Sequence, residues 1–160
     1  MDTHEQLRAL LDQEEATYRL IEHEPEGRTE VIAKIRGNKI EQSIKSMVLQ
    51  VRLTRKENMY CLANVPGDCR IDFEGVRNYF QADSVAFAKR EKAQELTGCV
   101  IGAIPPFSFN DKLQLLADPL IQENDEVVFN AGRLDRSIMM KLKDYIRIAK
   151  PQLVPIAQRG

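Results

Sequence analysis

Apolar residues along the chain follow two spacings, which predict a mixture of helices and strands. Spacing of three and four residues, typical of amphipathic helices, occurs over 3–15, 27–37, 72–80, 90–98 and 143–151. Short apolar and β-branched runs predict strands over 16–23, 43–53, 58–66, 83–88, 112–118, 125–132 and 137–141. Because this order lacks a strict strand–helix–strand alternation, the predicted fold class is α+β with a mixed, strongly curled sheet.

Local signals predict where these elements begin and end. Thr3 and Gln6 have the spacing of a capping box for the first helix, and Thr29 and Asp72 are expected to cap the second and third helices. The polar stretch 54–58 predicts a hairpin between two central strands. The predicted helix ends are Gly37, Gly98 and Pro151.

Composition indicates one folded domain, residues 1–160. Of the 160 residues, 43% are hydrophobic and 29% are charged, which is ordinary for a globular protein. The three cysteines form no CxxC pair, so we expect reduced thiols in a cytoplasmic protein rather than disulfides or a zinc site. The N-terminus lacks the pattern of a signal peptide, and no apolar run is long enough to span a membrane.

The net charge of −1 hides two basic segments. Residues 31–56 contain seven bases and one acid, and residues 132–160 contain seven bases and two acids. One interpretation is that the two segments converge on a face that binds phosphate groups. The alternative is two separate solvated faces.

Elimination removes most catalytic classes. A nucleophilic site would need His23, because His4 lies at the chain end, and no GxSxG motif accompanies it. A histidine in such a position more often caps a turn or lines a wall. Two histidines and three scattered cysteines form no recognisable metal site. There is also no GxxxxGK[ST] or GxGxxG motif for a nucleotide.

Two features remain as candidates for chemistry. Lys45 stands at the head of an otherwise apolar strand, where it is either a surface lysine with a buried stem or a charge that faces a cleft. The apolar stretch 95–109 contains Gly102, followed by Pro105 and Pro106. Such stiff backbone suits the orientation of a water or the binding of an oxyanion, although it also suits a buried connection that completes the core.

Five segments, in order, resemble the YbaK family, also called the prolyl-tRNA-synthetase-associated editing domain family. They are HEPEGRTE, IKSMVLQV, VPGDCRID, ELTGCVIGAIPPF and VVFNAGRLDRSI, and the resemblance covers about residues 18–141. The sequences TGCVIGAIPPFSF and FNAGRLDRS are especially similar to those of the stand-alone YeaK-type members. No single segment identifies the family, but the five segments in this order do.

The resemblance implies an α+β domain with a barrel-like sheet surrounded by helices, and an enzyme that deacylates mischarged tRNA in trans. It implies that Lys45 anchors the terminal adenosine or its phosphate. It also implies that the backbone of Gly102–Pro106 and a ribose hydroxyl of the tRNA position the attacking water. The implied partners are aminoacylated tRNA and, in some cases, a synthetase, with no cofactor and no metal. Serine or threonine, or another small residue such as alanine, is the implied amino acid.

The candidate substrate-binding residues all lie in the part of the chain that the resemblance covers, and each has a purely structural alternative as core, cap or turn residue. They are Tyr18, His23, Thr29, Ile44, Ser46, Met47, Ala103, Ile104, Pro105, Pro106, Asn130, Ala131 and Gly132. Ser46 and Asn130 differ from common family residues, which bears on the amino acid removed. Two other functions compete: a module that binds aminoacyl-tRNA or a synthetase without hydrolysis, and a hydrolase of small aminoacyl esters.

Overall fold

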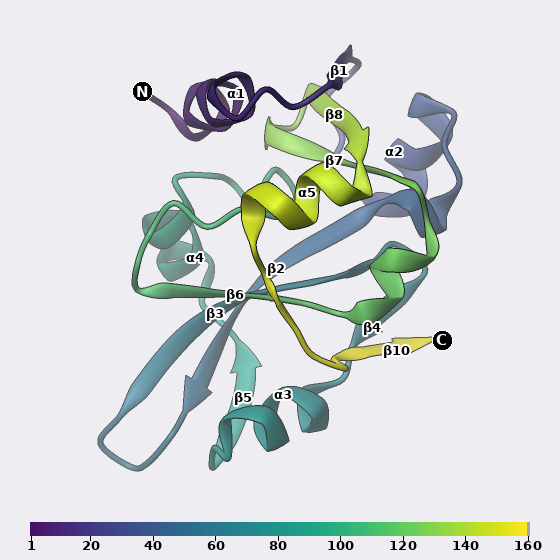
Figure 1. The fold of residues 1–160 in the computed structure, drawn as a ribbon. Helices are drawn as coiled ribbons and strands as arrows, with labels where there is room; N and C mark the ends of the chain where they lie inside the picture. Colours follow the sequence, from purple (N-terminus) through teal and green to yellow (C-terminus); the bar gives the residue numbers. More distant parts are fainter. Residues whose placement is uncertain (160) are drawn as a thin grey trace.

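Strand β2 (Ile44–Arg52) is an inner strand of the largest sheet in the computed structural model, which describes residues 1–159 (Figure 1). It pairs antiparallel along its whole length with β3 (Asn58–Pro66), as the predicted hairpin requires. Parallel pairing then adds β6 (Leu113–Ala117) and β9 (Gln152–Leu153), while β5 (Ser84–Phe87) pairs antiparallel with the other edge of β2. The sheet is therefore mixed, as predicted.

Two smaller sheets complete the β structure. One has the order β1 (Tyr18–Glu22), β8 (Arg136–Lys141) and β7 (Glu126–Arg133), all antiparallel. The other pairs β4 (Cys69–Ile71) with β10 (Ala157–Arg159). A single parallel bridge between Ser43 and Val128 links the start of β2 to β7. None of the sheets in residues 1–159 closes on itself, so the barrel-like detail is not confirmed.

The five predicted helices are all present and lie around the sheets (Figure 1). They are α1 (Thr3–Gln13), α2 (Thr29–Arg36), α3 (Phe73–Phe80), α4 (Arg90–Thr97) and α5 (Leu142–Ala149). As predicted, α2 and α4 end at glycines with positive φ, Gly37 (77°) and Gly98 (71°). Within residues 1–159, every helix is too short or too polar to cross a bilayer.

The predicted capping box of the first helix was wrong, and so was the predicted cap of the second. The capping box of α1 is formed by Asp2 and Glu5, because the Asp2 carboxylate accepts the Glu5 amide (2.8 Å). The Thr3 hydroxyl instead donates to the Thr97 carbonyl (2.7 Å), which ties α1 to the end of α4. Thr29 is the first residue of α2 rather than its cap. Asp72 caps α3 as predicted.

Several short elements were not predicted. They are β4, β9, β10 and the 3₁₀ helices Ile40–Gln42 and Pro119–Glu123. All are too short for a periodic pattern, and the three strands depend on partners distant in sequence. The buried Asp118 carboxylate, for example, accepts the amides of Ile156 and Ala157 (both 2.7 Å) and so fixes the C-terminal segment.

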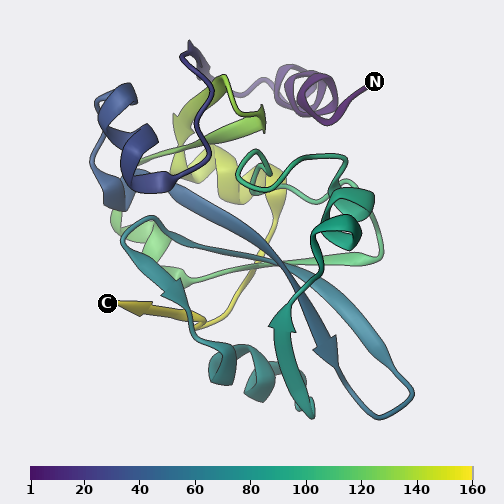
Figure 2. The ribbon, with the colours of Figure 1, turned by 180° about the vertical axis from the view of Figure 1, so that it is seen from behind.

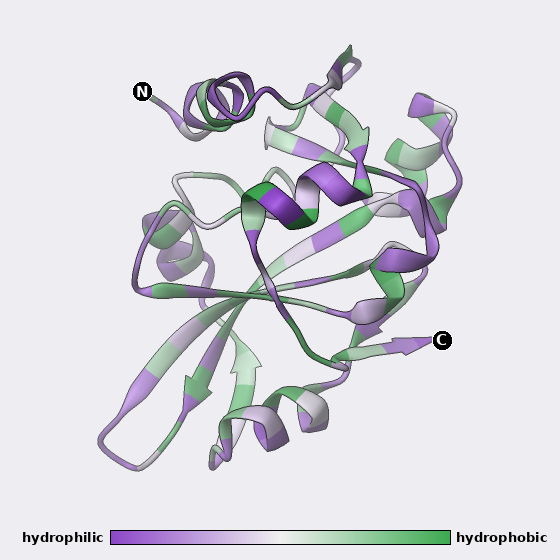
Figure 3. Ribbon diagram, viewed as in Figure 1, coloured by the Kyte–Doolittle hydropathy of each residue, from purple (hydrophilic) through white to green (hydrophobic). Residues whose placement is uncertain are grey.

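The core consists of three apolar clusters along the sheets, and the ribbon coloured by hydropathy shows apolar stretches on the central strands and polar residues at the β2–β3 tip (Figure 3). The loop after α4 contributes to two of the clusters. Phe107 packs against Phe129 and Tyr145, with ring centroids 5.8 and 5.2 Å away. Val100 and Ile101, in contrast, are about half exposed. The loop therefore has a core-forming half and an exposed half.

Candidate active site

A cavity of about 180 Å³ is lined by residues from the start of β2, α2, β7 and the loop after α4. Figure 2 shows the ribbon of these segments from behind. That volume holds roughly six water molecules at about 30 Å³ each, so a small amino-acid side chain fits. The lining residues come from four stretches of the chain: Gly27, Thr29, Ile32, Arg36, Ser43, Ile44, Lys45, Ser46, Met47, Ile101, Gly102, Ile104, Phe129 and Asn130.

The cavity is located beside the part of β2 that pairs with only one neighbouring strand. Strand β3 pairs with β2 from Ile44 to Arg52, but β5 pairs only from Leu49 to Arg52. The first half of β2 thus presents an edge without a strand partner, and the apolar loop lies beside it instead. An interrupted sheet edge of this kind gives backbone and side chains access to a ligand.

Lys45 lies on this first half of β2 and its side chain lines the cavity while half-buried. In residues 1–159 its ammonium has no carboxylate within ion-pair distance. Its neighbour Ser46 is anchored by a hydrogen bond to the Asn64 side chain (2.5 Å). Lys45 is therefore an uncompensated charge beside a rigid strand, available to an electron-rich group.

Gly102 is required for a reason that differs from the sequence interpretation. Its φ is +92°, a conformation that favours glycine. A Cβ at this position would also lie 2.9 Å from the Gly27 Cα, closer than side chains approach backbone. The absent side chain thus permits close packing of two backbone segments at the cavity rim, rather than simply leaving room for a substrate.

Asn130 fixes these two segments together. Its side-chain amide donates to the Glu26 carbonyl (3.0 Å) and to the Gly102 carbonyl (2.7 Å). Its oxygen accepts the Ser137 hydroxyl (3.0 Å). Because donors face one end of the amide and acceptors the other, its orientation is determined by the network. Asn130 therefore both lines the cavity and positions the Gly102 backbone.

Arg36, which the sequence analysis did not single out, extends the network to the cavity floor. Its guanidinium donates to Ser137 (2.9 Å), Ser43 (3.0 Å) and Asn38 (3.0 Å). No described carboxylate lies within ion-pair distance. Burial of this unpaired charge lowers the pKa of Arg36 to about 10, so it stays positive at neutral pH.

The structure brings together eight of the predicted site residues and leaves others elsewhere. The eight that line the cavity are Thr29, Ile44, Lys45, Ser46, Met47, Gly102, Ile104 and Asn130. Ala103, Pro105 and Pro106 are buried next to it, where the Pro106 carbonyl accepts the Tyr145 hydroxyl (2.8 Å). These three residues are buried in the core, where they support the loop and do not line the cavity.

Four predicted residues lie away from the cavity. Tyr18 is on β1, where its hydroxyl bonds to Asp12 (2.8 Å) on α1. Ala131 is fully buried, and a Cβ on Gly132 would meet the His4 backbone at 2.9 Å, so both pack under α1. His23 is excluded from the lining but reaches the network through Ser137.

His23 and Ser137 form a pair that superficially resembles a nucleophile and its base, with His23 Nε2 2.7 Å from Ser137 Oγ. Ser137 is fully buried, however, and its oxygen already accepts a bond from Arg36. A nucleophile must reach the substrate, and this hydroxyl cannot. The pair belongs to the supporting network, consistent with a histidine that fixes a wall.

The described cavity lining contains no carboxylate, histidine or cysteine. Glu26, next to Gly27, is held by Arg28 (2.9 Å), which lowers the pKa of its carboxyl to about 2 and makes it a poor base. Cys61, Cys69 and Cys99 are free buried thiols, and burial raises the pKa of each. In residues 1–159 no group of three or more acidic, histidine or cysteine side chains is arranged for a metal.

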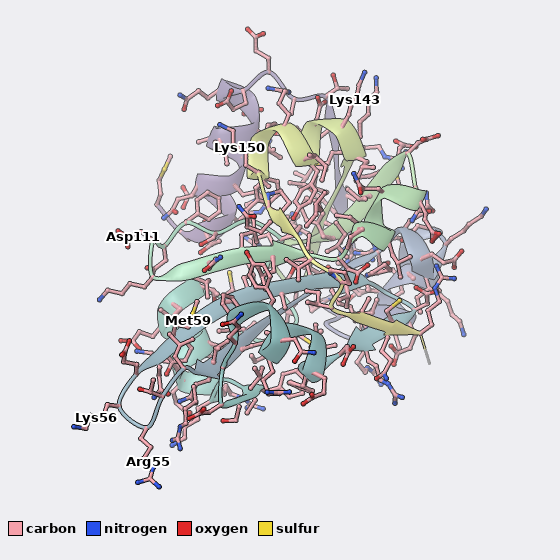
Figure 4. The ribbon with its side chains drawn as sticks, turned by 60° about the horizontal axis from the view of Figure 1, so that its bottom comes forward. Arg55, Lys56, Met59, Asp111, Lys143 and Lys150 are labelled. Carbon is pink, nitrogen blue, oxygen red and sulfur yellow. The ribbon has the colours of Figure 1, made fainter. Side chains whose placement is uncertain are left out.

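The two basic segments meet beside the cavity, where Arg36 donates to Ser137, but other cations of the segments lie far apart. Figure 4 shows Arg55 and Lys56 at the β2–β3 tip, and Lys143 and Lys150 on α5 at the opposite end of the molecule. Only the first segment reaches the cavity, through Arg36 and Lys45. Because other parts of the two segments meet beside the cavity, the interpretation of one shared phosphate-binding face stays a prediction.

The lining residues that sequence reasoning missed had weak signals. They are Gly27, Ile32, Arg36, Ser43, Ile101 and Phe129. Arg36 is an ordinary basic residue in the last turn of a helix until its burial is known. Gly27 lies in a turn-like stretch, but its approach to Gly102 joins residues that are far apart in sequence.

Comparison with known proteins adds to this geometry. The family model described as the aminoacyl-tRNA editing domain matches residues 23–148. The Multifunctional Ser/Thr-tRNA deacylase ProXp-y of Escherichia coli (strain K12) is 44% identical over 153 residues, 95% of this chain and 91% of that protein. The proline–tRNA ligase of Bacillus licheniformis is 25% identical over 114 residues, 71% of this chain but 19% of the ligase.

The fold also matches a crystal structure of a candidate trans-editing enzyme for prolyl tRNA synthetase, with a TM-score of 0.80. The match covers 99% of this chain and 98% of that one at 20% sequence identity, so it speaks to the fold alone. It confirms a single-domain α+β fold.

Proposed function

The chain belongs to the aminoacyl-tRNA editing domain family, and from that premise we propose that it hydrolyses the ester of mischarged aminoacyl-tRNA. The observation that carries the proposal is the composition of the cavity. It combines an uncompensated lysine and a rigid glycine backbone with a lining that offers no side-chain base. An aminoacyl ester is already activated, so positioning and charge stabilisation suffice for its hydrolysis.

The proposed reaction adds water to the ester carbonyl carbon, and the bond from that carbon to the ribose oxygen then breaks. One water proton ends on the ribose oxygen, and the products are the free amino acid and the tRNA 3′ hydroxyl. Because the lining lacks a base, the neighbouring ribose hydroxyl of the substrate is the group that orients the water. Lys45 supplies positive charge to the terminal nucleotide or to the developing oxyanion.

Beside the charge of Lys45, the Gly102 backbone supplies preorganised polar groups for the reaction. Asn130 and Gly27 hold it in place before any substrate arrives, so its polar groups need no rearrangement during the reaction. Thr29, Ile44, Met47 and Ile104 form the remaining walls, and the limited volume excludes large side chains. In this proposal Asn130 is a positioning residue.

The E. coli relative is named for serine and threonine, and we extend that substrate class to this chain. Both side chains suit a small cavity with polar groups on its floor. The proposed substrate implies action in trans on tRNA in the cytoplasm. Association with a synthetase and barrel-like closure of the sheets stay predictions, the first prompted by the similarity to proline–tRNA ligases.

Deacylation of tRNAs charged with Ser, Thr, Ala, Cys or Pro tests the proposal. We expect release of Ser and Thr above the uncatalysed rate, and little release of Pro. Binding of these tRNAs without any release would instead support the non-catalytic module. Equally fast hydrolysis of small aminoacyl esters, such as serine methyl ester, would support a hydrolase that does not need tRNA.

A further inference from the structure

The floor of the cavity is a polar cluster formed by Arg36, Asn38 and Ser43. Ser43 is 1% exposed, yet it is among the cavity-lining residues. Its oxygen accepts hydrogen bonds from Arg36 Nη2 (3.0 Å) and from Asn38 Nδ2 (3.1 Å). A hydroxyl has two acceptor positions and one proton, so both acceptor positions of Ser43 are occupied.

The Ser43 proton, in contrast, has no acceptor among the hydrogen bonds of residues 1–159. Two other hydroxyls in the site differ in this respect: Ser46 donates to Asn64, and Ser137 donates to Asn130. The hydroxyl of Thr29, which also lines the cavity, forms no hydrogen bond with a described residue, but Thr29 is only half-buried, whereas Ser43 is buried. The proton of Ser43 is therefore the one on a buried hydroxyl that remains available to a group entering the cavity. A buried donor of this kind favours a ligand with an acceptor oxygen.

The charge of the floor determines how an amino acid can enter. Arg36 is positive and has no carboxylate partner within ion-pair distance in residues 1–159. The α-ammonium group of an aminoacyl ester is repelled by this guanidinium, so it must face away from the floor. The side chain is then the part of the acyl group that points toward Ser43, between the apolar walls Ile32, Ile44 and Phe129.

We propose that Ser43, oriented by Arg36 and Asn38, donates a hydrogen bond to the side-chain hydroxyl of the amino acid that is removed. The inference rests on the proposed deacylase function and deepens it. Ser43 is the specificity-determining contact, and Arg36 is a positioning residue that keeps the Ser43 proton directed at the cavity. The site thus selects an acyl group by its hydroxyl as well as by its size.

Two substrate pairs test the inference in the wild-type protein. Ser- and Ala-charged tRNA differ by a hydroxyl, and Thr- and Val-charged tRNA are close in shape but differ in the same group. We expect kcat/KM to be about 10- to 100-fold higher for the hydroxyl member of each pair, the range that an unpaired buried donor costs. Release of all four at equal rates would overturn the inference and leave the deacylase function standing. Release of none would overturn both.

Variants then locate the contact. Ser43→Ala should reduce the Ser/Ala ratio toward one by slowing Ser release, and Ser43→Thr, which keeps the hydroxyl, should retain the preference. Ser137→Ala is the matched control, because Ser137 bonds to the same guanidinium but does not line the cavity. We expect it to lower both rates together and leave the ratio intact. A Ser/Ala ratio that persists in a folded Ser43→Ala protein, or collapses equally in Ser137→Ala, would overturn the assignment.

Discussion

The two basic segments carry seven positive residues each, but they differ in how many of these residues form ion pairs. In residues 132–159, Arg133, Arg136, Arg147 and Arg159 all form ion pairs with acids. In residues 31–56 none of the seven is in an ion pair with a described residue, and two of them line the cavity. Two segments with the same number of bases therefore differ in the electrostatic potential that they present to a ligand, because an ion pair offsets the charge of its base.

The largest expected effect comes from the unpaired cation at the cavity. Lys45→Ala should lower kcat/KM for Ser-tRNA deacylation by about 10²- to 10³-fold, the loss typical of one group that stabilises a developing charge. The half-buried side chain makes no hydrogen bond or ion pair with a described residue, so circular dichroism and the melting temperature should change little. Lys143→Ala, on the distant α5, is the matched control and should keep wild-type activity. Comparable rates for the two variants would remove Lys45 from the mechanism.

The next effect concerns the backbone beside that cation. Gly102→Ala should destabilise the fold by about 2 kcal/mol or more and strongly reduce activity, because it combines a positive φ with a 2.9 Å approach to Gly27. Gly37→Ala isolates the first cause, since Gly37 has a φ of +77° but nothing within 4 Å of its Cβ position. Chemical denaturation of both variants separates the two contributions. Equal losses of stability and activity would show that contact with Gly27 is unimportant.

A smaller effect is expected at the tip of the β2–β3 hairpin. If its unpaired cations meet tRNA phosphates, Arg55→Gln with Lys56→Gln should lower the slope of log K against log salt by about 1 to 2. Lys143→Gln with Lys150→Gln, at the opposite end, should leave the slope unchanged. Binding titrations at several salt concentrations measure both. A reversed pattern would place tRNA on the α5 face.

The smallest effect is expected for the pKa of Asp135, which lies in residues 132–159. Arg133, 2.9 Å from Asp135, lowers the pKa of that carboxyl to about 2. Because the folded pKa is below the ordinary value of 3.8, the pair stabilises the fold above that pH and loses this contribution as the pH falls toward 2. Carboxyl NMR shifts should show an Asp135 pKa near 2, rising in Arg133→Gln. An unchanged pKa in the variant would contradict the assignment of this shift to Arg133.

Much of the fold could be predicted because its elements are locally encoded. The spacing of apolar residues gave all five helices, and Gly37 and Gly98 marked two helix ends correctly. The missed elements, such as β4 and β10, are two or three residues long and depend on a partner distant in sequence. Pattern alone carries no information about such pairing.

The site was predictable where a residue's type was unusual for its position. Lys45 at the head of an apolar strand and Gly102 in a stiff loop were identified in this way, and both line the cavity. Arg36 and Ser43 were not, because an arginine in a last helical turn and a serine before a strand are ordinary in sequence. The role of Arg36 arises from burial and from its bond to Ser137, about a hundred positions away, and that of Ser43 arises from burial and from its bonds to Arg36 and Asn38.

A structure with a seryl-adenosine analogue, in which a stable amide replaces the ester, tests the central claim most directly. The account predicts the acyl group inside the cavity, with its carbonyl between the Lys45 ammonium and the Gly102 backbone. An acyl group bound elsewhere, with this cavity left empty at saturating ligand, would contradict it.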